Sequence, residues 1–358
     1  MSNLKSGPQR GYEEMKTEID SFKEFFQTKI AVLEEENKRI KNKVRELSNE
    51  NDEIIKLLLP EKKRHLKKNT ISFDLTSFAL PDEILSRLGG KPVKIVDVGA
   101  FELEGQDDLY SELFLRYQSE VVGFEPQNSS IVSKITGKCV KKILPWAIGD
   151  GEKTTFYKTK YPAASSTYPP DLTFLKSFIA LPDMLEVAEV FEIDTKKLDD
   201  IDEIKDCDLL KLDVQGGELK VLQGAERLLR DVSIIMTEVE FSPVYEKQPV
   251  FSCIDSFLRN HGFFLLDLAN HGYASFKAGM FNDLKSRLMW ADAIYIKQPD
   301  ILEKGAPEKI LMSILLAHMV LRDPSLAAFL LEVYDHKTGS SFLDAYQAQM
   351  QLMRRCYL

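Results

Sequence analysis

The sequence predicts an α/β protein with a mostly parallel sheet and helices on both of its faces, preceded by an N-terminal coiled-coil helix and followed by a short helical region. Short apolar runs that are typical of buried strands recur between residues 93 and 241, and helical segments alternate with them. Acidic residues and glycines follow these runs, as they do at the ligand-binding edge of open α/β sheets. Residues 1–70 show a different, helical periodicity.

The apolar positions from Ile30 to Leu58 alternate steps of three and four, which is the heptad pattern of a coiled coil. Asn37 and Asn51 fall at a positions, which favours a parallel two-stranded coil in which the asparagines pair. We therefore expect a homodimer, with a trimer as the alternative. The expected segments are a coiled-coil helix, a basic linker with a lead-in, an α/β domain and a helical region, at residues 12–59, 60–90, 91–298 and 299–358.

Composition and charge exclude several classes of protein. The net charge of −9 argues against a nucleic-acid partner, because phosphate contacts require a basic face. Residues 1–70 contain 16 Lys and Arg against 13 Asp and Glu, so 31 basic and 43 acidic residues remain for the rest of the chain. No apolar run is long enough to span a membrane and no signal peptide is visible, so we expect a cytoplasmic protein. The four cysteines form no C-x-x-C pair, and no metal site is predicted from them.

The first two strands carry the signature of a nucleoside site. The run VKIVDVGA (93–100) places Asp97, Gly99 and Ala100 at a tight turn after a buried strand, where a ligand can approach the backbone. The run EVVGFEP (120–126) ends in Glu125 and Pro126, and an acidic residue at this place accepts hydrogen bonds from a ribose diol. The glycines are too few and too widely spaced for G-x-G-x-x-G, which argues against a dehydrogenase.

Residues 141–157 predict a strand to Ile148, a Gly-Asp-Gly turn and a returning strand. Trp146 and Ala147 would then lie at the carboxyl end of a strand, where an adenine could rest against backbone and apolar surface. Both residues are candidate ligand contacts.

Carboxylates follow the next two strands. In DLLKLDVQGGE (208–218), Asp213 ends a strand and Glu218 begins a helix over ELKVLQGAERLL, where it is either a ligand contact or a charge that stabilises the helix N-terminus. Glu238 and Glu240 lie two residues apart on the strand VSIIMTEVEF (232–241), so they share one face and are candidates for a general base or a sugar-hydroxyl clamp.

The last elements of the α/β domain are expected to be a helix over 251–262 and an antiparallel hairpin of strands over 263–270 and 291–297. His261 is predicted to cap the helix, whereas His271 follows a strand end and is a candidate base.

Taken in order, several motifs resemble the FkbM-type methyltransferases. They are VDVGA, VVGFEPQ, LPWAIGDG, SSTY (165–168), KKLDDI, LLKLDVQGGELKVLQGA and TEVEFSPVYEKQPVFSCIDSFLRNHGF. The resemblance covers about residues 91–350. It implies a Rossmann-like class I methyltransferase fold with a mostly parallel seven-stranded sheet, S-adenosylmethionine as cofactor, and methyl transfer to a hydroxyl of a glycan or polyketide.

The resemblance also assigns roles to residues. It places Asp97, Gly99 and Glu125 on the cofactor and the segment from Asp213 to Glu218 beside the reacting methyl. Gln215 departs from the pattern, since many members have glutamate there, and the stretch FELEGQDD after the first turn is longer and more acidic than a minimal glycine loop.

Our mechanistic hypothesis makes Asp213, Glu238 or Glu240 the general base, with a loop containing Ser165, Ser166 and Tyr168 over the substrate. Two alternatives stay open. The first is a catalytically weak scaffold that binds partners in polysaccharide assembly. The second is metal-assisted methyl transfer, with Asp213, Glu238, Glu240 and His271 as ligands.

Overall fold

The structure is a computed structural model, and the residues that it describes belong to one compact unit, residues 74–358. The described residues are 80, 82–101, 110, 113, 116–277, 279 and 287–356. The coiled coil predicted over 12–59 and most of the stretch after Gly99 lie outside them. The predicted lead-in segment ends in a helix, α3 (Asp82–Leu88).

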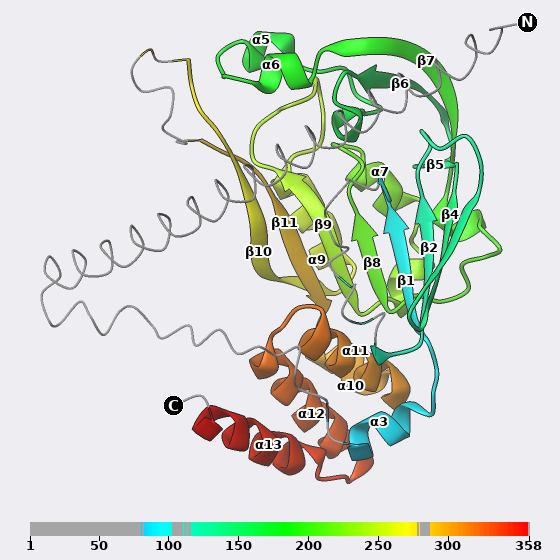
Figure 1. The fold of residues 1–358 in the computed structure, drawn as a ribbon, viewed down its shortest axis with the longest axis vertical. Helices are drawn as coiled ribbons and strands as arrows, with labels where there is room; N and C mark the ends of the chain where they lie inside the picture. The colour runs from blue at the N-terminus through cyan, green and yellow to red at the C-terminus, as the bar shows by residue number, and fades with distance from the viewer. Residues whose placement is uncertain are drawn as a thin grey trace, which may run out of the picture. The chain divides into compact units, whose positions relative to one another are not determined.

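The centre of the fold is an eight-stranded sheet with the order β10-β11-β9-β8-β1-β2-β4-β3 (Figure 1). Its strands are β1 (Val93–Val98), β2 (Ser119–Phe124), β3 (Val132–Thr136), β4 (Cys139–Leu144), β8 (Leu209–Leu212), β9 (Ile234–Glu240), β10 (Phe263–Ala274) and β11 (Arg287–Lys297). The five neighbouring strands β9, β8, β1, β2 and β4 are parallel to one another. At the two sides of the sheet, β3 pairs antiparallel with β4, β11 with β9, and β10 with β11. The carboxyl ends of the parallel strands therefore meet at one edge.

Successive residues of the inner strands pack into different cores on the two faces of the sheet. In β1, Val93 and Ile95 lie in one core with α3, while Val96 and Val98 lie in the other. The second core is covered by α7 (Glu218–Gln223), α8 (Leu228–Asp231) and α9 (Phe251–Asn260). Burial on both faces explains why these strands are almost continuously apolar.

A second, smaller sheet has the strand order β5-β7-β6 and lies near the carboxyl ends of the main strands (Figure 1). It consists of β5 (Ala147–Ile148), β6 (Lys153–Thr159) and β7 (Val187–Lys196). Two short helices, α5 (Leu172–Leu175) and α6 (Leu181–Met184), lie between β6 and β7 in the sequence. This sheet and its connections supply one wall of the pocket described below.

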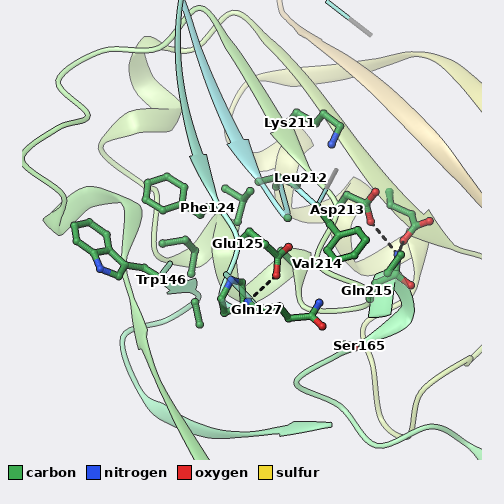
Figure 2. Close-up of a pocket in the computed structure, with 18 of the residues that line it drawn as sticks. Phe124, Glu125, Gln127, Trp146, Ser165, Lys211, Leu212, Asp213, Val214 and Gln215 are labelled. Carbon is green, nitrogen blue, oxygen red and sulfur yellow. Dashed lines mark hydrogen bonds between the residues drawn. The ribbon is translucent and has the colours of Figure 1, made fainter. Parts of the chain in front are cut away.

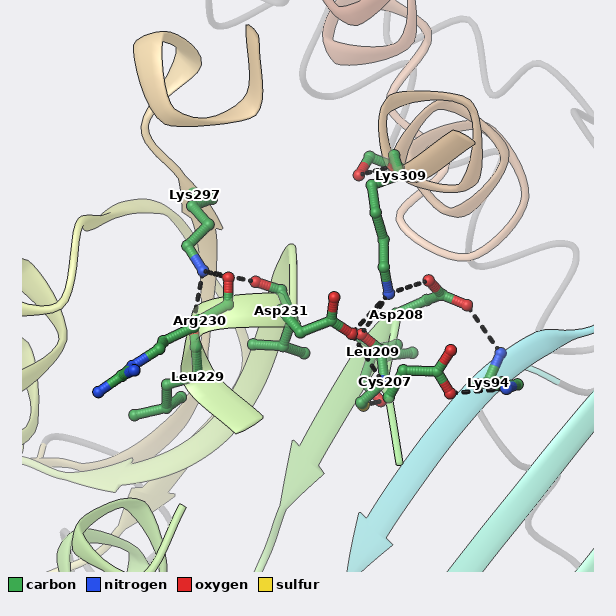
Figure 3. A network of polar contacts seen from close by, with 12 residues as sticks. Lys94, Cys207, Asp208, Leu209, Leu229, Arg230, Asp231, Lys297 and Lys309 are labelled. Atoms are coloured by element: carbon green, nitrogen blue, oxygen red, sulfur yellow. Dashed lines mark hydrogen bonds and ion pairs between the residues drawn. The ribbon is translucent and has the colours of Figure 1, made fainter. Parts of the chain in front are cut away.

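Four helices follow the main sheet: α10 (Pro299–Lys304), α11 (Pro307–Met319), α12 (Pro324–Thr338) and α13 (Phe342–Cys356). With α3 they lie at the end where β1 begins (Figure 1). Lys309 on α11 contacts Asp208 and Asp231 at N–O distances of 3.0 and 2.8 Å, and Asp208 also accepts the backbone N–H of Lys94 (Figure 3). None of the described helices is long and apolar enough to cross a bilayer.

The structure confirms an α/β fold and the antiparallel hairpin near the C-terminal end of the α/β domain, but it corrects three details. The sheet has eight strands and is mixed, because β3 adds an unpredicted edge strand. The run over 141–157 does not form one hairpin, since β5 and β6 both pair with β7 instead. The helix predicted over 218–229 breaks at Gly224, where a Cβ atom would lie 2.2 Å from the carbonyl oxygen of Gly149.

Candidate active site

A pocket of about 580 Å³ opens at the carboxyl ends of β1, β2, β8 and β9 (Figure 2). This is the edge at which open α/β sheets bind ligands, and the volume is typical of a small-molecule site. Glu125, Trp146, Asp213, Glu238 and Asp292 all line it. Residues predicted to bind a nucleoside and residues predicted to do chemistry thus share one cavity.

Gly99, which lines the pocket, brings two strand ends together. Its φ is +82°, and a Cβ atom on it would lie 1.7 Å from the carbonyl oxygen of Asp213. A side chain at this position is therefore incompatible with the contact between the turn after β1 and the end of β8. We predicted glycine here to let a ligand approach, and the structure adds the close approach of the protein's own backbone as a reason.

Glu125 follows β2 with its carboxylate at the pocket. Its Oε1 accepts the backbone N–H of Gln127 at 2.8 Å, and the Gln127 side chain is held by the carbonyl oxygen of Pro162 at 3.0 Å. Burial raises the pKa of Glu125, while the hydrogen bonds from Gln127 oppose this rise. The carboxylate is thus fixed in orientation and short of solvent, so it is suited to accept hydrogen bonds from a ligand.

An apolar wall lies beside Glu125. Trp146, Ala147 and Ile148 line the pocket, as does Phe124, whose ring stacks on Trp146 with 6.2 Å between the centroids. The Nζ of Lys196 lies 3.5 Å from the centroid of the Trp146 ring. This wall offers a flat apolar surface for an aromatic base.

Asp97 does not line the pocket. Its Oδ1 lies 3.0 Å from Lys211 Nζ and its Oδ2 accepts the hydroxyl of Tyr110, so both oxygens have protein partners. Burial alone would lower the pKa of Lys211, but the carboxylates of Asp97 and Asp213 raise it overall. Lys211 does line the pocket, and sequence reasoning missed it. A lysine within the apolar strand run LLKL was the signal that could have indicated a buried ion pair.

Asp213 and Glu238 are joined by Gln215. The amide Nε2 of Gln215 donates to Asp213 Oδ1 at 2.9 Å and to Glu238 Oε2 at 2.6 Å (Figure 2). The Tyr245 hydroxyl donates to Oε1 of Gln215 at 3.0 Å, and this bond fixes the orientation of the amide. The backbone of Gln215 has a φ of +57°. Burial and the nearby Asp213 carboxylate raise the pKa of Glu238 well above its usual value. The site therefore holds two carboxyl groups on one amide donor, and burial favours the protonated form of Glu238.

Two other predicted carboxylates lie behind the pocket rather than in its wall. Glu218 and Glu240 are fully or almost fully buried, and Glu218 Oε1 accepts the backbone N–H of Val214 at 2.8 Å. Burial raises the pKa of Glu218 to about 7 and that of Glu240 well above its usual value. One oxygen of each, with the Nε2 of Gln248, has no hydrogen-bond partner among the described residues. The hydrogen bond from Val214 to Glu218 spans the Gly216-Gly217 turn and stabilises it from the protein interior.

The remaining predicted residues divide between the pocket and its surroundings. Ser165 and Pro126 line the pocket, whereas Ala100 and Tyr168 do not. Ser166 donates its hydroxyl to the carbonyl oxygen of Gln215 at 2.6 Å and so ties this loop to the site. His271 lies within β10, exposed and outside the pocket lining. His261 ends α9, with Nδ1 2.8 Å from the carbonyl oxygen of Phe257, as expected for a capping residue.

The proposed metal-ligand set is divided by the structure. Asp213 and Glu238 face the pocket, but Glu240 is buried behind it and His271 is exposed. Within the described parts of the chain, no group of three or more His, Cys, Asp and Glu side chains has the arrangement of a metal site.

Comparisons with known proteins give a family match and a weak structural similarity. Residues 97–265 match the family model described as the methyltransferase FkbM domain. Among solved structures, the chain is similar to magnesium protoporphyrin IX methyltransferase from Synechocystis PCC 6803 with bound S-adenosylmethionine. That similarity has 11% identity and a TM-score of 0.25, over 61% of this chain and 76% of the other. No curated protein matches significantly.

The matched range begins at Asp97, before the Gly99 turn, and ends within β10, so it contains Glu125, Asp213 and Glu238. Methyltransferases of this family use S-adenosylmethionine as their cofactor. Residues 97–265 of this chain are a methyltransferase domain of the FkbM family.

Proposed function

We propose that this chain is an S-adenosylmethionine-dependent O-methyltransferase that acts on a hydroxyl of a glycan or a related acceptor. The observation that carries the proposal is one pocket that Glu125, Asp213 and Glu238 line together. A nucleoside donor and a hydroxyl acceptor need such a shared cavity, because the reacting atoms must meet within it.

The pocket residues fit the nucleoside half of the cofactor. Glu125 would accept hydrogen bonds from the ribose diol, and the backbone at Gly99 would lie against the donor. The apolar wall of Phe124, Trp146 and Ala147 would hold the adenine. When bound, the cofactor supplies an electrophilic methyl group on a positively charged sulfur.

The chain's own residues would position and deprotonate the acceptor. The acceptor oxygen would take the methyl group from the donor sulfur, and the sulfur would keep the electron pair of the broken bond. The hydroxyl proton passes to a carboxylate, and we assign this role to Asp213. Glu238 is less suited to accept it, because burial and the nearby Asp213 carboxylate raise its pKa and so favour its protonated form. Gln215 would hold the two side chains at a fixed separation.

Ligand-induced stabilisation tests this function. S-adenosylmethionine and S-adenosylhomocysteine should each raise the melting temperature of the full chain in a concentration-dependent way, since they bind the native state. NAD serves as the control, because the glycine pattern does not fit a dinucleotide. A scaffold without a donor site would show no shift with any of the three.

We further propose that the chain forms a parallel coiled-coil dimer through residues 12–59. The support is the heptad pattern, with Asn37 and Asn51 at a positions. Light scattering should give the mass of a dimer for the full chain and that of a monomer for a variant that lacks residues 1–70. A mass of three chains would favour the trimer, and a monomeric full chain would contradict the coiled coil.

A further inference from the structure

We propose that Asn270 and Asp292 form the acceptor subsite of this pocket, and that the subsite takes an uncharged polyol such as a neutral sugar and excludes anionic acceptors. The inference rests on the proposed function and extends it to the class of acceptor. Neither residue was singled out by the sequence, and both line the pocket.

A β-bulge places Asn270 at the pocket. In the β10–β11 pair, Ala269 is opposite Asp292 and Gly272 is opposite Trp290, so two residues of β10 face one residue of β11. Bulges of this kind re-aim side chains, and Asn270 adopts a φ of +46°, which asparagine tolerates better than most residues. Its Nδ2 consequently donates to Asp292 Oδ2 at 2.7 Å.

The backbone next to the bulge has little freedom to change. A Cβ atom on Gly272 would lie 2.0 Å from the Trp290 ring, so the strand returns to its partner only because residue 272 is glycine. The position of Asn270 is therefore set by the register of the hairpin rather than by the side chain alone.

Asp292 lies directly beside the reacting groups. It is the register partner of Glu238 across the β9–β11 pair, and all three of Asp213, Glu238 and Asp292 line the same cavity. The hydrogen bond to Asn270 uses one oxygen of Asp292. Its Oδ1 and the amide oxygen of Asn270 have no hydrogen-bond partner in the described part of the chain. These oxygens are suited to accept hydrogen bonds from neighbouring hydroxyls while a third hydroxyl lies at Asp213.

The charge of this part of the pocket decides which acceptors fit. Asp213, Glu238 and Asp292 line it, and the nearby cation, Lys211, is paired with Asp97 at 3.0 Å. The two other lysines that line the pocket, Lys134 and Lys141, belong to β3 and β4, on the opposite side of β1 from β9 and β11. A carboxylate or phosphate on the acceptor would lie beside the carboxyl groups of Asp213 and Asp292, and the lysine on this side of the pocket already has a partner in Asp97. Neutral hydroxyls meet no such penalty.

Saturation-transfer NMR on the full chain loaded with S-adenosylhomocysteine tests the subsite. The probes are the methyl glycosides of glucose, galactose and mannose, each compared with the methyl glycoside of its uronic acid. The two members of each pair share the sugar ring and differ only in the group on C5, which is hydroxymethyl in the neutral glycoside and carboxylate in the uronate. At least one neutral glycoside should bind, and its uronate should bind about tenfold more weakly or not at all.

Variants separate the subsite from general effects. Asp292→Ala and Asn270→Ala should each weaken neutral glycoside binding about tenfold, because each removes hydrogen-bond acceptors. Asp292→Asn should reduce the difference in affinity between the neutral glycoside and its uronate, because it removes a negative charge. Asp267→Asn, at an exposed position on β10, should leave the affinities for the glycoside and for the uronate unchanged. If one alanine variant does not fold, the other still provides the test.

Three results would overturn the inference: equal binding of glycoside and uronate, no binding of any glycoside, or wild-type binding by both alanine variants. In each case binding of S-adenosylhomocysteine would remain, so the proposed function would stand. If S-adenosylhomocysteine itself failed to bind, the proposed function would be wrong and the acceptor subsite with it.

Discussion

Gly99 lies against the carbonyl oxygen of Asp213, and a Cβ atom on Gly99 would be 1.7 Å from that oxygen. The contact joins the turn after β1, next to the proposed nucleoside site, to the end of β8, where we place the general base. Cofactor position and catalytic carboxylate position therefore depend on the same backbone approach.

Substitution of Gly99 by alanine should disrupt both sites. The positive φ and the backbone clash together should destabilise the fold by about 2–4 kcal/mol and abolish binding of S-adenosylhomocysteine. Gly90→Ala is the matched control, because Gly90 also has a positive φ (+71°) but an added Cβ would contact nothing within 4 Å. Urea unfolding should show a cost of only about 1 kcal/mol for the control. Equal costs for the two variants would show that the contact with Asp213 is unimportant.

The Gln215 amide should be needed to hold Asp213 and Glu238 together. Gln215→Glu replaces a donor to both carboxyl groups by a further carboxylate, which can donate only while it is protonated. The melting temperature of the variant should fall more steeply than that of the wild type as the pH rises from about 6 to 9. Gln223→Glu is the control, because it adds the same charge at an exposed position of α7, away from Asp213 and Glu238. Parallel curves for the two variants would contradict the bridging role.

Glu218 should make stability depend on pH. Burial raises its pKa to about 7 in the folded chain, above the ordinary 4.5, so the folded state holds the proton more tightly than the unfolded state. Its contribution to stability is present in full below about pH 4.5 and is lost as the pH rises through about 7. Glu218→Gln should flatten the dependence of unfolding free energy on pH in this window. The exposed Glu226→Gln should not, and an equal effect of both would refute the assignment.

Lys309 should stabilise the attachment of α11 to the sheet. Burial alone would lower the pKa of Lys309, but Asp208 and Asp231 raise it overall, so the side chain is a cation between two carboxylates. Lys309→Met leaves the nearly buried Asp208 without this partner, and we expect a loss of about 2–4 kcal/mol in urea unfolding. Lys304→Met removes an exposed pair with Asp300 and should cost less than about 0.5 kcal/mol. Donor binding should be unchanged in both, since Lys309 and Lys304 lie outside the pocket lining.

Residues at strand ends were the most predictable part of the site. Glu125, Asp213 and Glu238 follow or end apolar runs, and the parallel topology brings such positions to one edge. Period two correctly put Glu238 and Glu240 on one face, but it could not show that only Glu238 reaches the pocket. That difference depends on which segment covers the end of β9, which strand periodicity does not encode.

Features that depend on contacts distant in sequence could not be predicted. The bulge at Asn270 arises from the register of β10 against β11, and the bridge at Gln215 requires a backbone conformation unusual for glutamine. Asp97 was expected to contact the cofactor, yet its oxygens are taken by Lys211 and Tyr110. The break at Gly224 follows from the approach of Gly149, 75 positions earlier in the chain.

Isothermal titration calorimetry with S-adenosylmethionine and S-adenosylhomocysteine tests the central claim most directly, namely that Glu125 in this pocket binds the nucleoside of the donor. The wild type should bind both ligands, and Glu125→Ala should bind them at least about tenfold more weakly, because hydrogen bonds to a carboxylate are lost. Glu120→Ala, at an exposed position on the strand that precedes Glu125, should bind as the wild type does. Absence of binding to the wild type, or wild-type affinity in Glu125→Ala, would contradict the account.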